Sequence, residues 1–82
     1  MFIKVGGKEY ELSTKLGTAK AIEQRFKVPI IQLFNRLQDA TVDDLVAIVE
    51  IAGKQTGDKA FRDDLVEHYD YLDLYLVVSE VV

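Results

Sequence analysis

The sequence has no cysteine and only one proline, Pro29, among its 82 residues. Without cysteine there is no disulfide framework, no thiolate metal site and no thiol nucleophile. No stretch approaches the roughly 18 consecutive apolar residues of a membrane span. The first residues also lack the long apolar region and cleavage site of a signal peptide. We therefore expect a soluble cytoplasmic protein with no membrane partner.

Apolar side chains, in contrast, are abundant enough for one hydrophobic core. Hydrophobic residues make up 49% of the chain, which is too many for a disordered sequence. The length suits a single domain over residues 1–82. At this size about 60% of the surface of the unfolded chain can be buried, so we expect modest stability.

The net charge of −4 is unevenly distributed along the chain. Residues 1–27 carry six Lys or Arg against three Glu, whereas residues 28–82 carry four basic against eleven acidic residues. An acidic total disfavours nucleic acid as a partner. The asymmetry is compatible either with head-to-tail self-association or with two solvated faces of opposite sign, and the second is the simpler interpretation.

Gly6-Gly7 predicts a β-hairpin over residues 2–12. Segments of strand character flank the two glycines, and both positions of such a turn need a positive φ angle. We expect Ile3 and Val5 to share a face of the hairpin, with Tyr10 and Leu12 across from them on the second strand. Because a two-stranded hairpin alone is marginal in water, another element must cover it.

Four helices are predicted after the hairpin, over residues 18–27, 29–38, 42–52 and 59–76. The fold class is therefore α+β, mostly α, with an N-terminal β-hairpin followed by a bundle of about four short helices. Residues 18–37 contain two amphipathic helices separated at Pro29. We expect this stretch to form the core onto which the other elements pack.

Polar residues at the helix ends agree with these boundaries. Thr18, Thr41 and Asp58 are the expected N-caps, and Asp44 follows Thr41 at the spacing of a capping box. Gly53 is expected at the C′ position of the third helix.

The last predicted helix sets Phe61, Leu65, Leu72 and Leu76 on its core face. In that helix Leu74 and Val78 project toward the acidic side, where a monomer does not bury them. Tyr71 and Tyr75, four residues apart, form an amphipathic contact patch. The predicted protein-interaction residues are Tyr71, Leu74, Tyr75 and Val78. Residues 76–82 are compatible with a final helical turn, a strand, or a segment that a partner orders.

The densest ionisable cluster has two interpretations. Its members, three or four residues apart on one helix, could bridge a divalent cation, as a metal-dependent enzyme would require. No loop supplies carbonyl ligands, so a solvated helix face is favoured. The cluster consists of Asp63, Asp64, Glu67, Asp70 and Asp73.

Two further motifs are weak signals of chemistry. His68, the only histidine, has no nucleophile or orienting partner at a recognisable spacing. Gly6-Gly7-Lys8 is followed by a strand pattern, whereas a phosphate-binding loop precedes a helix. We therefore predict no catalytic, metal-binding or cofactor-binding residue.

A family resemblance rests on Ile3-Lys4-Val5-Gly6-Gly7-Lys8-Glu9-Tyr10-Glu11-Leu12, then Leu16-Gly17-Thr18-Ala19 and Ile22-Glu23. These segments resemble the opening of small tail assembly chaperones of tailed phages and prophages. The likeness covers residues 2–37 best and continues as the order of helices to about residue 75. It implies a non-enzymatic protein without cofactors that binds the tape measure protein, or recruits tail tube protein, and forms oligomers in some members.

The competing hypothesis is a small homodimeric structural or regulatory adaptor of phage or bacterial origin. Its basis is the uncovered edge of the predicted hairpin and the β-branched tail, since either segment could pair with a second copy.

Overall fold

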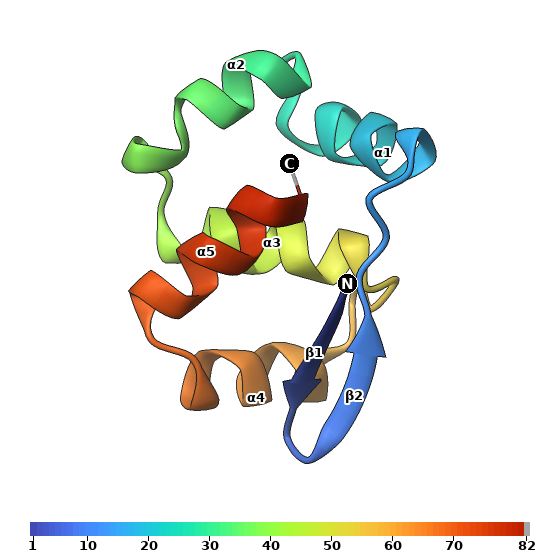
Figure 1. Cartoon of the computed structure of the whole chain (residues 1–82), viewed down its shortest axis with the longest axis vertical. Helices are drawn as coiled ribbons and strands as arrows, with labels where there is room; N and C mark the ends of the chain where they lie inside the picture. Colours follow the sequence, from blue (N-terminus) through green and yellow to red (C-terminus); the bar gives the residue numbers. More distant parts are fainter. Residues whose placement is uncertain (82) are drawn as a thin grey trace.

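The computed structural model describes residues 1–81, which form an antiparallel two-stranded hairpin followed by five α-helices (Figure 1). This architecture confirms the α+β, mostly helical class. In chain order the elements are β1 (Phe2–Val5), β2 (Lys8–Glu11), α1 (Leu16–Phe26), α2 (Ile30–Asn35), the short 3-10 helix η1 (Leu37–Asp39), α3 (Val42–Ala52), α4 (Lys59–His68) and α5 (Tyr71–Val81).

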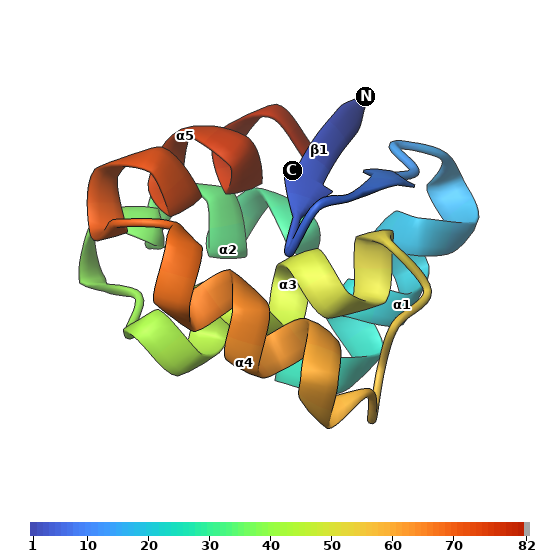
Figure 2. The ribbon, with the colours of Figure 1, turned by 90° about the horizontal axis from the view of Figure 1, so that it is seen from below.

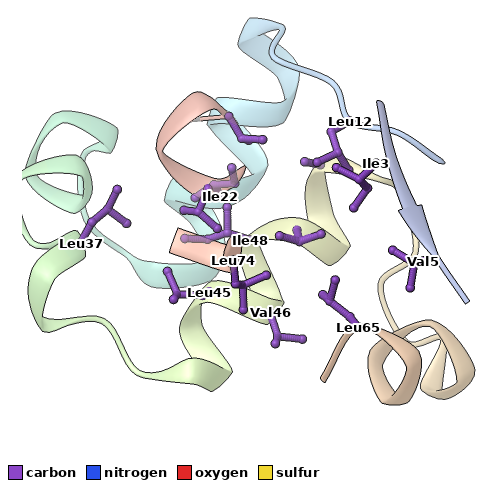
Figure 3. Packing of buried hydrophobic residues seen from close by; sticks show 14 of the residues in the cluster. Ile3, Val5, Leu12, Ile22, Leu37, Leu45, Val46, Ile48, Leu65 and Leu74 are labelled. Atoms are coloured by element: carbon purple, nitrogen blue, oxygen red, sulfur yellow. The ribbon is translucent and has the colours of Figure 1, made fainter. Parts of the chain in front are cut away.

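The central element is α3, which is buried around its whole circumference. Every residue from Leu45 to Glu50 is buried, and so is Ala52. A helix that is apolar on all sides is one that other elements surround. Figure 3 shows Leu45 and Ile48 in the middle of the packed side chains. The residues from other parts of the chain in this cluster are Ile3, Val5, Leu12, Ile22, Leu33, Leu37, Phe61, Leu65, Leu74, Val78 and Val81.

The prediction that residues 18–37 form the core is wrong. Ile22, Leu33 and Leu37 are buried there, but the large side chains of Ile31 and Phe34 are exposed. The two helices of this stretch therefore cover one side of α3 and leave apolar side chains on the surface.

The predicted break between the first two helices is confirmed, although α1 begins earlier than expected. Lys15 is the N-cap of α1, so Thr18 lies inside the helix and the N-cap prediction for it is wrong. Pro29 is the N-cap of α2. The backbone N–H of Ile30 donates to Oε2 of Glu23 at 2.7 Å. This contact satisfies one of the free donors at the start of α2 and ties α2 to α1.

The hairpin turn is confirmed in detail. Gly6 and Gly7 have φ angles of 58° and 83°, which glycine adopts without steric cost. Ile3 of β1 is paired with Tyr10 of β2. The ring of Tyr10 meets the ring of Phe61 edge-on, with centroids 4.9 Å apart. The hairpin is therefore covered by α4, as a two-stranded sheet requires.

Two of the predicted N-caps are also confirmed. Asp44 N–H donates to Oγ1 of Thr41 at 3.1 Å, and Thr41 N–H donates to Oδ2 of Asp44 at 3.3 Å, completing a capping box. Asp58 accepts a hydrogen bond from the N–H of Phe61 at 3.1 Å. These contacts fix the start of α3 and of α4.

At the end of α3 the left-handed residue is Lys54, with φ of 57°, and not Gly53 as predicted. Gly53 has φ of −89°. A Cβ atom on Gly53 would lie 3.2 Å from Cδ2 of Leu12. Glycine therefore serves here to let the end of the hairpin approach α3 closely.

The largest departure from prediction is the division of residues 59–76 into two helices. The backbone of Tyr69 is extended, with φ of −113° and ψ of 136°. Asp70 then accepts a hydrogen bond from the N–H of Asp73 at 2.8 Å and caps the new helix. Of the predicted tail, residues 76–81 complete α5, and Val82 lies outside the described residues.

A tyrosine at this elbow fastens α4 and α5 to the hairpin. The hydroxyl of Tyr69 donates to the backbone carbonyl of Lys4 at 2.9 Å. Burial raises the pKa of the Tyr69 phenol, and the negative charge of Asp73 raises it further. The neutral hydroxyl is thereby favoured in the folded protein.

We expect Tyr69→Phe to lower the free energy of unfolding by about 0.5–1 kcal/mol at neutral pH, because the hydrogen bond from the Tyr69 hydroxyl to the Lys4 carbonyl is lost. The contribution of a raised pKa is fully present below the unfolded value of about 10 and is lost as pH rises through the folded value. Urea unfolding followed by circular dichroism should show a constant gap between the wild type and Tyr69→Phe up to about pH 9, and a gap that narrows as pH rises above about 10. A gap that stays constant above about pH 10 would refute the account of the elbow.

Candidate functional site

The structure moves two of the four predicted interaction residues into the core. Leu74 is 3% exposed and Val78 is 0% exposed, so the prediction that they face a partner is wrong. Tyr75 is half-buried and packs against the core cluster. Tyr71 stays largely on the surface, where its hydroxyl donates to the carbonyl of Ala40 at 3.1 Å.

The cause is a change of helical phase at Tyr69 and Asp70. A single helix through residue 76 would place Leu72 and Leu76 inside, but the interruption turns them outward. Leu72 is 64% exposed and Leu76 is 53% exposed. Because these two residues are four apart on α5, their side chains are neighbours on one side of the helix.

A second exposed pair lies on α2. Ile31 is 72% exposed and Phe34 is 49% exposed, because Leu33 takes the buried position of this short helix. Figure 1 shows α2 along the top of the molecule and α5 below it, packed on α3, and Figure 2 shows the same helices from below. We call Ile31, Phe34, Leu72 and Leu76 the exposed apolar pairs. Each pair places two large apolar side chains next to each other on the surface, which makes it a candidate contact for another polypeptide.

A cavity of about 480 Å³ opens elsewhere, between α1, α3 and the start of α4. Its apolar lining comes from Ala21 of α1 and from Ala47 and Ile51 of α3. Its charged lining comes from Arg25 and from two residues that form an ion pair. This volume falls within the range of small-ligand sites.

The ion pair at this cavity joins Glu50 of α3 to Arg62 of α4. Glu50 is the one charged residue buried among residues 1–81. Its Oε1 accepts a hydrogen bond from Nε of Arg62 at 3.0 Å. A buried carboxylate needs such a partner, because its desolvation is otherwise uncompensated. Sequence reasoning missed this site, since its residues are separated by up to about forty positions and no motif connects them.

The predicted acidic cluster lies mainly on the surface of α4 and α5. Asp63, Glu67 and Asp73 are exposed, and Asp70 is used as a helix cap. Within the described part of the chain, no three His, Asp or Glu side chains are arranged to hold a metal ion. His68 is exposed at the end of α4. None of the helices formed by residues 1–81 is long and apolar enough to cross a membrane.

Comparison of the chain with protein-family models, with curated proteins and with solved structures finds no match.

We expect Arg62→Ala to lower the free energy of unfolding by about 1–3 kcal/mol, because the buried carboxylate of Glu50 loses its donor. Combining Arg62→Ala with Glu50→Gln should recover part of this loss, since the charge that needs a partner is then absent. Urea unfolding of the two single variants and the double variant measures the coupling.

The matched control is Arg36→Ala, which removes an exposed arginine and should change stability by less than about 0.5 kcal/mol. If Arg62→Ala were no more destabilising than Arg36→Ala, the buried ion pair would not contribute to stability.

Proposed function

We propose that the protein is a non-enzymatic tail assembly chaperone of a tailed phage or prophage, which acts in the cytoplasm of the host. Its partner would be the tape measure protein or the tail tube protein. Two observations support this proposal. Residues 2–37 resemble the opening of that family, and the exposed apolar pairs offer another polypeptide four large side chains on two helices. The second observation carries the argument for protein binding.

The mechanism follows from the chemistry of the exposed apolar pairs. Amphipathic segments of the partner would lay their apolar faces on Ile31 and Phe34 of α2 and on Leu72 and Leu76 of α5. Complete burial of a side chain of this size stabilises a contact by about 1.5–3 kcal/mol. An unassembled client would thereby have part of its aggregation-prone surface covered.

Charge adds a requirement on the partner. Asp70 and Asp73 lie beside Leu72 at the start of α5, and Asp73 is exposed. Basic residues that flank the apolar face of the client helix would pair with them, which favours the correct orientation and speeds encounter.

The alternative, a homodimeric adaptor, loses one of its two supports. Residues 76–81 belong to α5 and are not a free strand that could pair with a second copy. The edges of the two-stranded hairpin remain as its basis. Light scattering over a concentration series separates the two functions, because a protein that stays monomeric at high concentration cannot be the adaptor.

The direct test is co-expression of the tagged chain with overlapping fragments of a tape measure protein and with a tail tube protein, followed by co-purification. We expect at least one fragment to be retained by the wild type. The double variants Ile31→Ser/Phe34→Ser and Leu72→Ser/Leu76→Ser should each reduce retention about tenfold or more, since each removes apolar area equivalent to several kcal/mol.

Val66→Ser is the matched control, because Val66 is an exposed apolar residue of α4 outside the exposed apolar pairs. It should retain the fragment as the wild type does. Failure of the folded wild type to retain any fragment or the tail tube protein would contradict the proposal, and equal loss in the control would contradict the assigned surface.

A further inference from the structure

The cavity between α1, α3 and α4 combines an apolar lining with charged side chains. The side chains of Ala21, Ala47 and Ile51 supply the apolar part. Arg25 and Arg62 bring two guanidinium groups, and Glu50 brings one carboxylate. The three charged side chains together leave one net positive charge at the cavity, which favours an anion.

Each guanidinium is held by a contact that leaves hydrogen-bond donors available. Glu50 engages Arg62 through its Nε atom at 3.0 Å. Within residues 1–81, no hydrogen bond occupies the terminal nitrogens of Arg62. The guanidinium of Arg25 lies 5.2 Å from the centroid of the Phe26 ring, which restricts its position through a cation–π contact. Donors that are positioned in advance bind a ligand at a lower entropy cost.

The chemistry of these groups selects one kind of anion. Guanidinium groups match the planar geometry of a carboxylate. A monoanion balances the one net positive charge of these groups, whereas a dianion such as phosphate would leave an uncompensated negative charge beside the buried Glu50. The ligand should also carry a hydrocarbon group, because only an apolar group would displace water from Ala21, Ala47 and Ile51.

We propose that this cavity is a binding site for a small aliphatic carboxylate. The carboxylate pairs with Arg25 and Arg62, and the hydrocarbon stem lies on Ala21, Ala47 and Ile51. The site shares no residue with the exposed apolar pairs, so it stands or falls independently of the chaperone function.

Sodium hexanoate is the probe, because it combines a carboxylate with a five-carbon stem. Methyl NMR of the full chain reports on Ala21, Ala47 and Ile51 directly, and Ile31 serves as a reference methyl group outside the cavity. We expect saturable shifts at the cavity methyls with a dissociation constant on the order of millimolar, as suits a ligand of this size.

Three other solutes at equal ionic strength test the selectivity. Acetate should bind at least about tenfold more weakly, since it lacks most of the buried methylene groups. Hexylammonium chloride and inorganic phosphate should give no saturable shift, because the first has the wrong charge and the second has no stem.

Two variants complete the experiment. Arg25→Gln removes an exposed guanidinium and should weaken hexanoate binding about tenfold, the loss of one charge-assisted contact. Ala21→Leu fills the cavity from α1 and should abolish the shifts at Ile51, while the dispersion of the remaining spectrum reports that the variant is folded.

The proposal is overturned if the cavity methyls respond no more than Ile31, if hexylammonium binds as well as hexanoate, or if Arg25→Gln leaves the dissociation constant unchanged. Binding of a client protein by the wild type would not count in favour of the carboxylate site, since client binding depends on the exposed apolar pairs.

Discussion

The burial of α3 on all sides is the constraint on which the rest of the structure depends. Its six consecutive buried residues, Leu45 to Glu50, cover every side of the helix and are at most 7% exposed. A helix of this kind is unstable alone and needs cover from several directions. The hairpin, α1, α2, α4 and α5 each contribute buried side chains to that cover. Glu50 is the one charged residue among these six, and its carboxylate is paired with Arg62 of α4. Both residues of this ion pair line the cavity.

The elbow at Tyr69 and Asp70 decides which side of the C-terminal segment meets solvent. Because Asp70 caps a new helix, α5 returns across α3 and buries Leu74 and Val78 against it. The same change of phase leaves Leu72 exposed, together with Leu76 one turn later. A two-residue interruption thus creates part of the surface that we assign to a protein partner. The bond from the Tyr69 hydroxyl to the hairpin links this elbow to the opposite end of the chain.

Features decided by a few adjacent residues could be predicted from the sequence, and features decided by packing could not. The Gly6-Gly7 turn and the Thr41 capping box depend on local backbone chemistry, and both are confirmed. The choice of α3 as the centre depends on which of several apolar helices the others surround, which no local pattern specifies. The helix break was missed because apolar residues continue at helical spacing through residue 76, although Asp70 was available as a cap. Because of this error, Leu74 and Val78 were predicted to be exposed, although both are buried.

Native-state hydrogen exchange tests the central position of α3 most directly. If α3 is the element that all others cover, its amides from about residue 46 to residue 52 exchange only through global unfolding. Their free energies of exchange should then equal the free energy of unfolding from urea denaturation, whereas amides of α2 should exchange through local opening at lower free energy. Amides of α2 that exchange as slowly as those of α3, or amides of α3 that exchange well below the global value, would contradict the account.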